Sequence, residues 1–279
     1  ASILVDFNKF SLTVTANNPD LTAWQDVVAE QQKSNKSVKI AMVGKYTGLS
    51  DAYKSVNEAL VHAGIKNKVK VAIEYIDAEA IEQDGVEVLQ EMDGILVPGG
   101  FGERGMDGKI LAAKYARENN IPYFGICLGM QIAVIEYARN VLNLDGASST
   151  EMNKSAKHPV INLMESQKDV TEKGGTMRLG AWDCNISKNS KVYNAYKTEL
   201  ISERHRHRFE FNNDYLEQIE AAGMKATGIN PKTGLVEVVE ITNHPWFVGV
   251  QYHPEYKSTV LKPHPLFVNF IKAALKYST

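Results

Sequence analysis

The run Tyr123-Phe124-Gly125-Ile126-Cys127-Leu128-Gly129 decides the fold, because an apolar stretch passes there into a helical pattern through a cysteine. Pro122–Ile126 has the length of a buried strand, and Gln131–Leu142 carries apolar residues at helical spacing. Glycines two residues before and after Cys127 let a strand and a helix approach without Cβ clashes. The stretch therefore predicts a strand, a strained turn at Cys127 and a helix.

The same rhythm of strand and helix runs through the chain upstream, from Ser37 onward. Apolar runs alternate with amphipathic stretches in the order Val38–Val43, Asp51–Ala63 closed by Gly64, Val69–Ile76, a helical pattern as far as Met92, Gly94–Val97 and Lys109–Glu118. Strands that alternate with helices form parallel sheets covered on both faces. The sequence therefore predicts an α/β fold, with a doubly wound, mostly parallel, flavodoxin-like sheet flanked by helices.

After Gly146 the pattern changes to polar loops and strand-like runs, which predict a mixed or antiparallel extension of the sheet. These runs are Pro159–Met164, Met177–Ile186, Leu200–Phe211, Val236–Thr242 and Phe247–Tyr252. Leu266–Tyr277 has the apolar spacing of a terminal helix packed on the sheet. Residues 37–279 are expected to form one domain. Residues 1–36 are read as a linker or N-terminal extension, irregular apart from one helix at Leu21–Gln32.

Composition bounds the class of protein. With 279 residues, of which 44% are hydrophobic, the chain can bury a sizeable core. A formal net charge of -2 provides no field for attracting nucleic acid, and no segment nears the roughly 20 apolar residues of a membrane span. Two cysteines and no signal peptide predict free thiols and a cytoplasmic protein, with neither nucleic acid nor membrane as a partner.

Cys127 is the candidate nucleophile. A strand-to-helix turn places its sulfur at a helix N-terminus, where the dipole and the free N–H groups favour the thiolate. The alternative is a buried cysteine between packing glycines, and the motif alone does not separate the two. Cys184 lacks flanking glycines, sits in a strand-like run and is expected in the core.

The candidate base is His253. The chain has four His-Pro pairs, at His158, His244, His253 and His264, and only His253 has an acid two residues on, Glu255. Because His253 and Glu255 follow an apolar strand, an extended chain would put both on one side, where the carboxylate orients the imidazole. The other three pairs are assigned to turn chemistry.

Acyl transfer also requires donors for an oxyanion. The backbone N–H of Leu128 follows the nucleophile, and Gly100 ends the run Ile95–Gly100 at the same carboxyl edge of the sheet. Gly100 and Leu128 are therefore the candidate oxyanion hole. A plain loop after a strand is the alternative for Gly100.

The basic run at 204–208, Arg-His-Arg-His-Arg, is not interpreted as a nucleic-acid patch. On a strand its arginines share one face and its histidines the other, and Glu203 and Glu210 are close by in the sequence. One arginine could clamp a carboxylate. His205 and His207 lack an obvious third ligand, so no metal site is expected.

The ordered set of the cysteine elbow, a preceding Pro-Gly-Gly at 98–100 and a distant His-Pro-Glu resembles the class I, or triad, glutamine amidotransferases. More specific runs at 42–47, 51–56 and 174–180, with the Arg/His run before Phe209, look like the glutaminase domains of CTP synthases. The match extends from about Pro19 to Tyr277. Leu21–Gln32 resembles the segment that leads into this domain from a synthetase domain. Glu165–Gly174 is shorter than the insertion in many relatives, and a trimmed surface loop is expected there.

The resemblance implies a role for each matching residue. It implies a triad of Cys127, His253 and Glu255 and an oxyanion hole of Gly100 and Leu128. Around glutamine it implies Gly100, Leu128, Gly129, Met130, Gln131, Glu151 and Arg208. Glu151 would face the substrate ammonium and Arg208 the substrate carboxylate.

The activity that the resemblance implies is hydrolysis of L-glutamine through a γ-glutamyl thioester, with the ammonia passing to a synthetase domain that converts UTP to CTP. No cofactor is expected in this chain, which contains no Gly-x-x-x-x-Gly-Lys-Ser/Thr phosphate loop; ATP and magnesium would serve the synthetase domain. The family further suggests a homo-tetramer and activation by GTP. The alternatives are an intracellular-protease-like hydrolase with the same elbow, and a non-catalytic relative that only binds glutamine or a partner.

Overall fold

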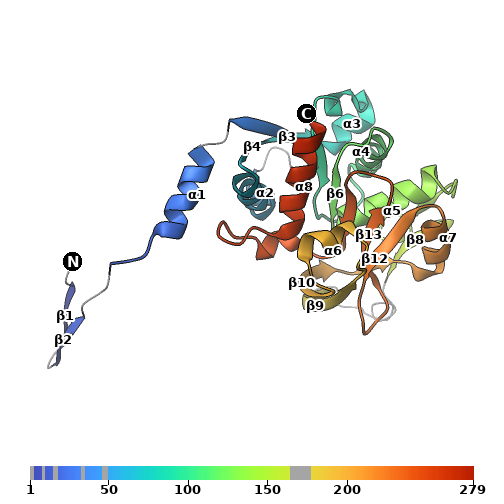
Figure 1. Cartoon of the computed structure of the whole chain (residues 1–279). Coiled ribbons are helices and arrows are strands. Elements are labelled where there is room, and N and C mark those ends of the chain that lie inside the picture. The colour runs from blue at the N-terminus through green and yellow to red at the C-terminus, as the bar shows by residue number, and fades with distance from the viewer. Residues whose placement is uncertain (1–2, 8–9, 15–17, 33–34, 46–49, 164–176) are drawn as a thin grey trace.

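The computed structural model describes residues 3–7, 10–14, 18–32, 35–45, 50–163 and 177–279, and its main body is built on one large sheet (Figure 1). The strands of this sheet are, in chain order, β3 Lys36–Gly44, β4 Val69–Asp77, β5 Gly94–Val97, β6 Tyr123–Ile126, β9 Arg178–Ile186, β10 Leu200–His207, β12 Met224–Ile229, β13 Val236–Ile241 and β14 Phe247–Val250. In space they follow the order β10-β9-β12-β13-β14-β6-β5-β3-β4.

The two halves of this sheet differ in strand direction. Strands β14, β6, β5, β3 and β4 pair in parallel, whereas β13, β12, β9 and β10 add antiparallel neighbours beyond β14. The predicted parallel sheet with a mixed extension is therefore confirmed. Its parallel half places the carboxyl ends of β5, β6 and β14 side by side, which is the edge where ligands bind in such sheets.

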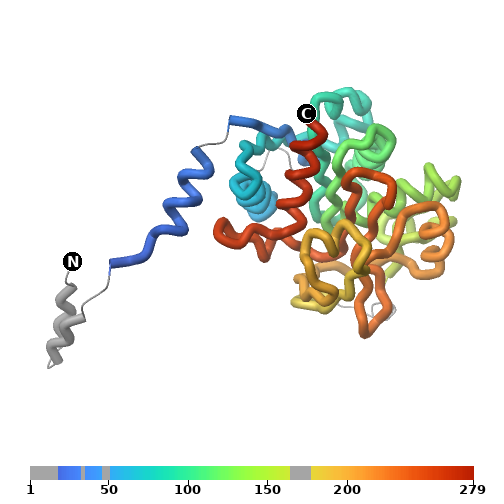
Figure 2. Tube along the Cα trace, in the orientation of Figure 1, coloured from blue at the N-terminus to red at the C-terminus, as the bar shows by residue number. Residues whose placement is uncertain are grey.

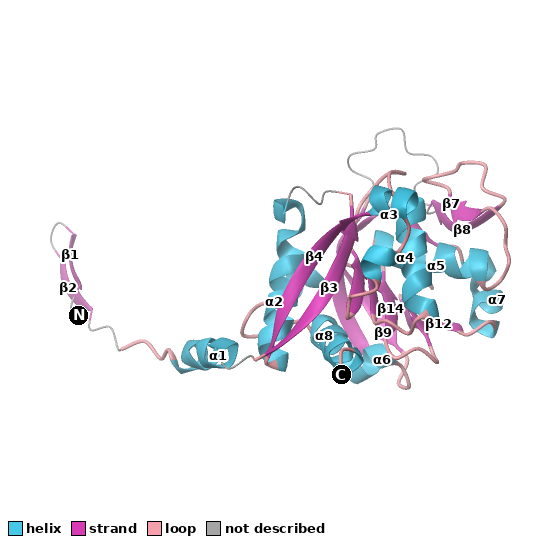
Figure 3. Cartoon of the chain, turned by 90° about the horizontal axis from the view of Figure 1, so that it is seen from above, coloured by secondary structure: helices cyan, strands magenta, loops and turns pink. Residues whose placement is uncertain are grey.

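Helices cover both faces of the parallel half (Figure 3). One face carries α2 Lys54–Asn67 and α8 Pro265–Tyr277, and the other carries α3 Ala78–Asp84, α4 Met106–Glu118 and α5 Leu128–Asn140. Alternation along β3 explains the two layers, since Ala41 and Val43 enter one buried cluster and Ile40 and Met42 the other. The sheet is thus buried on both sides, as predicted.

The C-terminal helix closes one of these layers. In Figure 2 the chain end returns beside the early part of the body, and α8 packs on α2 and β3. Phe124 of β6 meets Phe267 edge-on at a centroid distance of 5.2 Å and Phe270 at 5.7 Å. All three side chains are fully buried, so they fix α8 to the strand that precedes Cys127.

A smaller sheet lies against α5. It consists of β7 Ala147–Ser149, β8 His158–Leu163 and β11 Phe209–Phe211, in the order β11-β8-β7. The short helices α6 Lys191–Tyr196 and α7 Leu216–Ala221 pack on α8 and on β12. Single 3₁₀ turns occur at Ser50–Tyr53, Glu87–Leu89, Asn213–Tyr215 and Pro254–Lys257.

Several predicted boundaries are wrong, each for a local reason. Helix α2 runs past Gly64 to a left-handed cap at Lys68, because Gly64 is a packing glycine whose added Cβ would lie 2.8 Å from the Val69 carbonyl oxygen. The helical pattern before Met92 breaks at Gly85, whose φ of 93° ends α3. The run Leu200–Phe211 forms two strands of different sheets, β10 and β11.

The N-terminal segment is more regular than predicted. Strands β1 Ile3–Phe7 and β2 Phe10–Val14 pair antiparallel, in a sequence rich in the β-branched and aromatic residues that favour strands. The predicted helix is present as α1 Thr22–Gln32. Because β3 begins at Lys36, the 36/37 boundary falls inside its first two residues. The expected short loop at Glu165–Gly174 lies outside the described residues.

The buried aromatic contact of Phe124 leads to a prediction about stability. Phe124→Ala should lower the free energy of unfolding by about 3–5 kcal/mol, because it removes a fully buried ring and leaves a cavity. Urea unfolding followed by circular dichroism measures the difference. Val88→Ala is the control, since this side chain is 51% exposed, and equal losses from the two variants would contradict the packing described.

Candidate functional site

Cys127 occupies the turn between β6 and α5. Its backbone has φ 51° and ψ -101°, a conformation that side chains other than glycine rarely adopt. Its N–H donates to the Val250 carbonyl at 2.7 Å, which fastens the turn to β14. The strained turn predicted from the sequence is present.

The glycines around Cys127 allow this turn by close approach. A Cβ on Gly129 would lie 2.1 Å from the Val97 carbonyl oxygen, and one on Gly125 would lie 2.5 Å from backbone atoms of Gly129. Both distances are far inside van der Waals contact. Side chains here would push α5 off the sheet, so the first turn of α5 rests directly on β5 and β6.

His253 and Glu255 lie beyond the end of β14, next to Cys127. The imidazole Nδ1 and Glu255 Oε1 are 2.7 Å apart. Burial opposes the charged ring, but the neighbouring Cys127 sulfur and the Glu255 carboxylate outweigh burial and raise the pKa of His253. With Nδ1 held by Glu255, Nε2 is the ring atom left to exchange a proton with the sulfur.

The local backbone at this pair differs from the extended chain predicted. His253 caps a 3₁₀ turn, Pro254–Lys257, so Glu255 is in its first turn. Proline has the φ that such a turn needs at its first position, which explains the change of direction. The tight turn still brings the carboxylate onto Nδ1, and the ring of Tyr256 stacks on the imidazole at 5.3 Å.

The residues of the candidate oxyanion hole, Gly100 and Leu128, lie next to each other beside Cys127. Helix α5 begins at Leu128, so the Leu128 N–H has no acceptor within the helix. Gly100 is the neighbour of Leu128 across the pocket, since a Cβ built on Gly100 would lie 3.3 Å from Leu128 Cδ2. Gly99 packs against the imidazole of His253, because a Cβ built on Gly99 would lie 2.8 Å from His253 Cε1.

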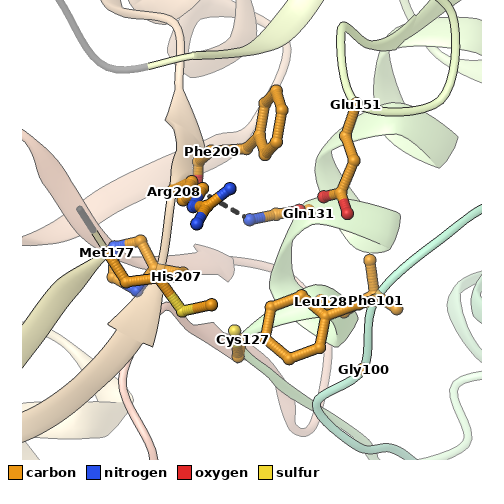
Figure 4. Close-up of a pocket in the computed structure, with 10 residues that line it drawn as sticks. All are labelled: Gly100, Phe101, Cys127, Leu128, Gln131, Glu151, Met177, His207, Arg208 and Phe209. Atoms are coloured by element: carbon orange, nitrogen blue, oxygen red, sulfur yellow. Dashed lines mark hydrogen bonds between the residues drawn. The ribbon is translucent and has the colours of Figure 1, made fainter. Parts of the chain in front are cut away.

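A pocket opens over Cys127 (Figure 4). Its walls come from five separate segments of the chain, and its lining residues are Gly100, Phe101, Cys127, Leu128, Gln131, Glu151, Met177, His207, Arg208 and Phe209. Most of the residues expected around a substrate line it. Gly129 and Met130 do not, because they face the sheet: the Cβ position of Gly249 lies 3.0 Å from Met130 Cα. Phe101, Met177, His207 and Phe209 were not predicted, since hydrophobic and histidine side chains of this kind have no distinguishing spacing.

Arg208 and Glu151 provide the charges of this pocket, from two different segments (Figure 4). Arg208 lies in the break between β10 and β11, and its buried Nε has no hydrogen-bond partner in the part of the chain that the structure describes. Glu151 accepts the Gly102 N–H at 3.3 Å. Burial raises the pKa of Glu151, against the lowering effects of that N–H, Lys45 and Arg208.

The basic run follows the predicted alternation over β10. Arg204 and Arg206 are exposed, while His205 and His207 are buried. Burial lowers the pKa of His205 to about 2, so this ring is neutral. Over the ranges with described side chains, no group of three or more histidine, cysteine, aspartate or glutamate residues could hold a metal ion.

The remaining cysteine and histidines have structural positions. Cys184 is fully buried on β9, and burial raises the pKa of its thiol. His264 caps α8 by accepting the Leu266 N–H, and His244 accepts the Trp246 N–H, as expected for turn chemistry. The third pair differs from this expectation, because His158 begins strand β8. None of the helices in the described ranges combines the length and apolar composition needed to cross a bilayer.

Comparison with known proteins connects this site to a family. A family model described as "Glutamine amidotransferase class-I" matches residues 48–273. The CTP synthase of Christiangramia forsetii is 57% identical over 94% of this chain and 48% of its own length, and that of Cytophaga hutchinsonii is 59% identical over 92% and 48%. The chain therefore spans about half the length of these curated relatives.

A solved structure matches most of the chain. The structure titled "Trypanosoma brucei CTPS - glutaminase domain with bound acivicin" has a TM-score of 0.81 and 43% identity, and the match covers 86% of this chain and 94% of that one. The identity and coverage are both high enough to place the chain in the same family. The chain belongs to the class I glutamine amidotransferases and, within them, to the glutaminase domains of CTP synthases.

Proposed function

We propose that this chain hydrolyses L-glutamine to glutamate and ammonia, with Cys127, His253 and Glu255 as its catalytic triad. The observation that carries the proposal is the elbow cysteine, held next to an imidazole whose Nδ1 lies 2.7 Å from a carboxylate. The charged pocket over the sulfur, with Arg208 and Glu151, matches a substrate that carries both a carboxylate and an ammonium group. Without an ordered base beside the elbow cysteine, the site would fit a protein that only binds glutamine equally well.

In the first half of the reaction, the Cys127 thiolate attacks the side-chain amide carbon of glutamine. The N–H groups of Gly100 and Leu128 stabilise the oxyanion of the tetrahedral intermediate. The C–N bond then breaks, and His253 gives its proton to the departing nitrogen, so that ammonia leaves and a γ-glutamyl thioester remains. The raised pKa of His253 supports this role, because it keeps the proton available at neutral pH.

In the second half, water attacks the thioester carbonyl while His253 accepts a proton from it. The second tetrahedral intermediate collapses with the C–S bond pair returning to sulfur, which frees glutamate. Glu255 keeps the tautomer and orientation of the ring through both steps without exchanging protons itself.

Substrate recognition is assigned to the two charged side chains. Arg208 has a buried Nε with no hydrogen-bond partner among the described residues, and a guanidinium binds a carboxylate with charge-assisted hydrogen bonds. Glu151 faces the substrate ammonium, whose arrival compensates for the burial of the carboxylate. Leu128 and Gln131 also line the pocket, and Gly129 and Met130 lie between them in the first turn of α5.

The wider role follows from the relatives. As the chain spans about half their length, we propose that it works with a synthetase domain that uses this ammonia, ATP and magnesium to convert UTP to CTP. No cofactor takes part in the hydrolysis itself. A homo-tetrameric whole enzyme, activation by GTP and a cytoplasmic location complete the proposal.

An electrophilic glutamine analogue tests the nucleophile. The analogue should modify Cys127 alone, because of the two cysteine thiols only that of Cys127 lines the pocket, whereas Cys184 is fully buried. Peptide mass spectrometry locates the adduct. Cys184→Ser is the matched control and should label like the parent. Labelling of Cys184, or labelling of Cys127→Ala at the parental rate, would remove Cys127 from the mechanism.

The arginine assignment makes a prediction about affinity. Arg208→Ala should raise KM for glutamine about 10- to 100-fold, since a hydrogen bond to a charged group contributes about 1.5–3 kcal/mol. Arg204→Ala is the control, because that side chain is exposed on β10. Steady-state ammonia release gives both values. If the two substitutions raised KM equally, Arg208 would not be the residue that binds the carboxylate.

The proposed dependence on a synthetase domain gives a further prediction. Supplied with UTP, ATP and magnesium, the chain alone should make no CTP from either glutamine or free ammonia, because ammonia bypasses only the glutaminase site. Adding a CTP synthase synthetase domain should raise glutamine turnover, since paired domains commonly order loops such as the one that carries Gly100. Chromatography of nucleotides measures the product. CTP formed from ammonia by this chain alone would contradict the proposal that the chain carries only the glutaminase activity.

A further inference from the structure

A buried glutamine, Gln251, lies beside the nucleophile at the end of β14. Its side chain is fully buried, and its backbone N–H donates to the Glu237 carbonyl at 2.9 Å. The residue before it, Val250, accepts the Cys127 N–H at 2.7 Å. Backbone hydrogen bonds on both sides therefore fix where the Gln251 side chain starts, at the edge of the sheet that carries the sulfur.

The side chain of Gln251 belongs to a series of three hydrogen bonds that ends on the sulfur. Gln251 Nε2 lies 3.7 Å from Cys127 Sγ, within the range of an N–H···S hydrogen bond. Gln251 Oε1 accepts from Gln131 Nε2 at 3.3 Å. Gln131 Nε2 also donates to the Phe209 carbonyl at 2.8 Å, the dashed line in Figure 4.

The order of donors and acceptors in this series of hydrogen bonds is fixed by the Phe209 carbonyl at one end. The Phe209 carbonyl oxygen can only accept, so the Gln131 atom that meets it is the NH₂ group. That group has a second hydrogen, and the Gln251 atom facing it must therefore be the carbonyl oxygen. The other end of the Gln251 carboxamide, which faces sulfur, is then an N–H donor. A flipped Gln251 would set two NH₂ groups against each other.

A donor aimed at this sulfur acts differently on its two states. A thiol is a weak acceptor, whereas a thiolate is an anion, and hydrogen bonds to an anion are about twice as strong as neutral ones. The site is also buried, which strengthens the contact further. The Gln251 amide therefore favours the thiolate over the thiol.

We propose that Gln251 is a further catalytic residue, whose carboxamide donates a hydrogen bond to the Cys127 thiolate. The role rests on the proposed glutaminase function and extends it. Through Gln131 the same series of hydrogen bonds connects the sulfur to Phe209, the neighbour of Arg208. It therefore couples the position of the nucleophile to the segment that binds the substrate carboxylate.

The Gln251 donor acts at the step of the reaction in which negative charge forms on the Cys127 sulfur. When water has attacked the thioester, the C–S bond breaks and its electron pair goes to sulfur, while the proton from water resides on His253. The Gln251 N–H meets the sulfur as this negative charge forms, so it lowers the barrier to releasing glutamate. The same contact is present in the resting enzyme.

The pH dependence of Cys127 alkylation by iodoacetamide tests the proposal without needing turnover. Gln251→Met keeps the length of the side chain and removes the donor, so the pH of half-maximal alkylation should rise by about one unit. Gln251→Glu keeps the shape of the side chain and replaces the donor with a carboxylate. It should raise the midpoint at least as much, because a second negative charge beside sulfur opposes the thiolate.

The controls separate this effect from misfolding and from failure of the proposed function. Gln218→Met makes the same chemical change at an exposed position and should leave the midpoint unchanged. Thermal unfolding identifies which Gln251 variants are folded, and a folded variant with the parental midpoint overturns the proposal. Should Gln251→Met fail to fold, the Gln251→Glu result decides alone. Ammonia release by the parent is measured separately, so a parent that cannot hydrolyse glutamine counts against the function, and the alkylation midpoints still decide the role of Gln251.

Discussion

The contact between the first turn of α5 and the sheet beneath it is the constraint on which the site depends. At Gly129 the helix backbone comes so near the Val97 carbonyl that a single Cβ would lie 2.1 Å from it. The connection from β6 to α5 is then too short for a relaxed turn, and Cys127 takes the strain with its φ of 51°. Such a conformation costs about 1–3 kcal/mol, and it persists because the packed core on both faces of the sheet holds the backbone in place. This arrangement places Cys127 and Leu128 on the pocket at the carboxyl edge of the sheet.

The opposite wall of the pocket is held by a buried charge cluster. Glu210 accepts from Arg178 at 3.2 Å and lies 3.0 Å from His207 Nε2, so it ties the residues before and after Arg208 to β9. These partners offset the cost of burying the Glu210 carboxylate. The break between β10 and β11 is thereby a fixed feature. It turns Arg208 toward the pocket, whereas Arg204 and Arg206 stay on the exposed face of β10.

How much could be predicted from the sequence differs between parts of the molecule. The elbow around Cys127 and the pair His253 and Glu255 are local patterns, because their chemistry depends on near neighbours in the chain. The parallel half of the sheet was likewise predictable from its alternation of strand and helix. Helix ends were harder, since the role of Gly64 depends on Val69 and Val71 rather than on its own neighbours. β12 was missed because Lys225, Thr227 and Gly228 interrupt its apolar pattern.

Contacts between distant segments could not be predicted from spacing. The departure of Arg208 from the strand alternation depends on Arg178, some thirty positions earlier in the sequence. Gln251 meets Cys127 only because β14 pairs with β6, and no local motif identifies it. The roles of Glu151 and Arg208 came from resemblance alone, and the structure places both side chains on the pocket over the sulfur.

The central claim is that Cys127 forms a covalent intermediate with glutamine, and trapping that intermediate tests it most directly. The chain is mixed with glutamine, quenched in acid within one turnover and digested, and the peptide that contains Cys127 is weighed. The account predicts one γ-glutamyl group on this peptide, released as the γ-glutamyl hydroxamate by hydroxylamine. Ammonia released in amounts equal to the enzyme, with no glutamyl group on Cys127 in the same quenched sample, would contradict it.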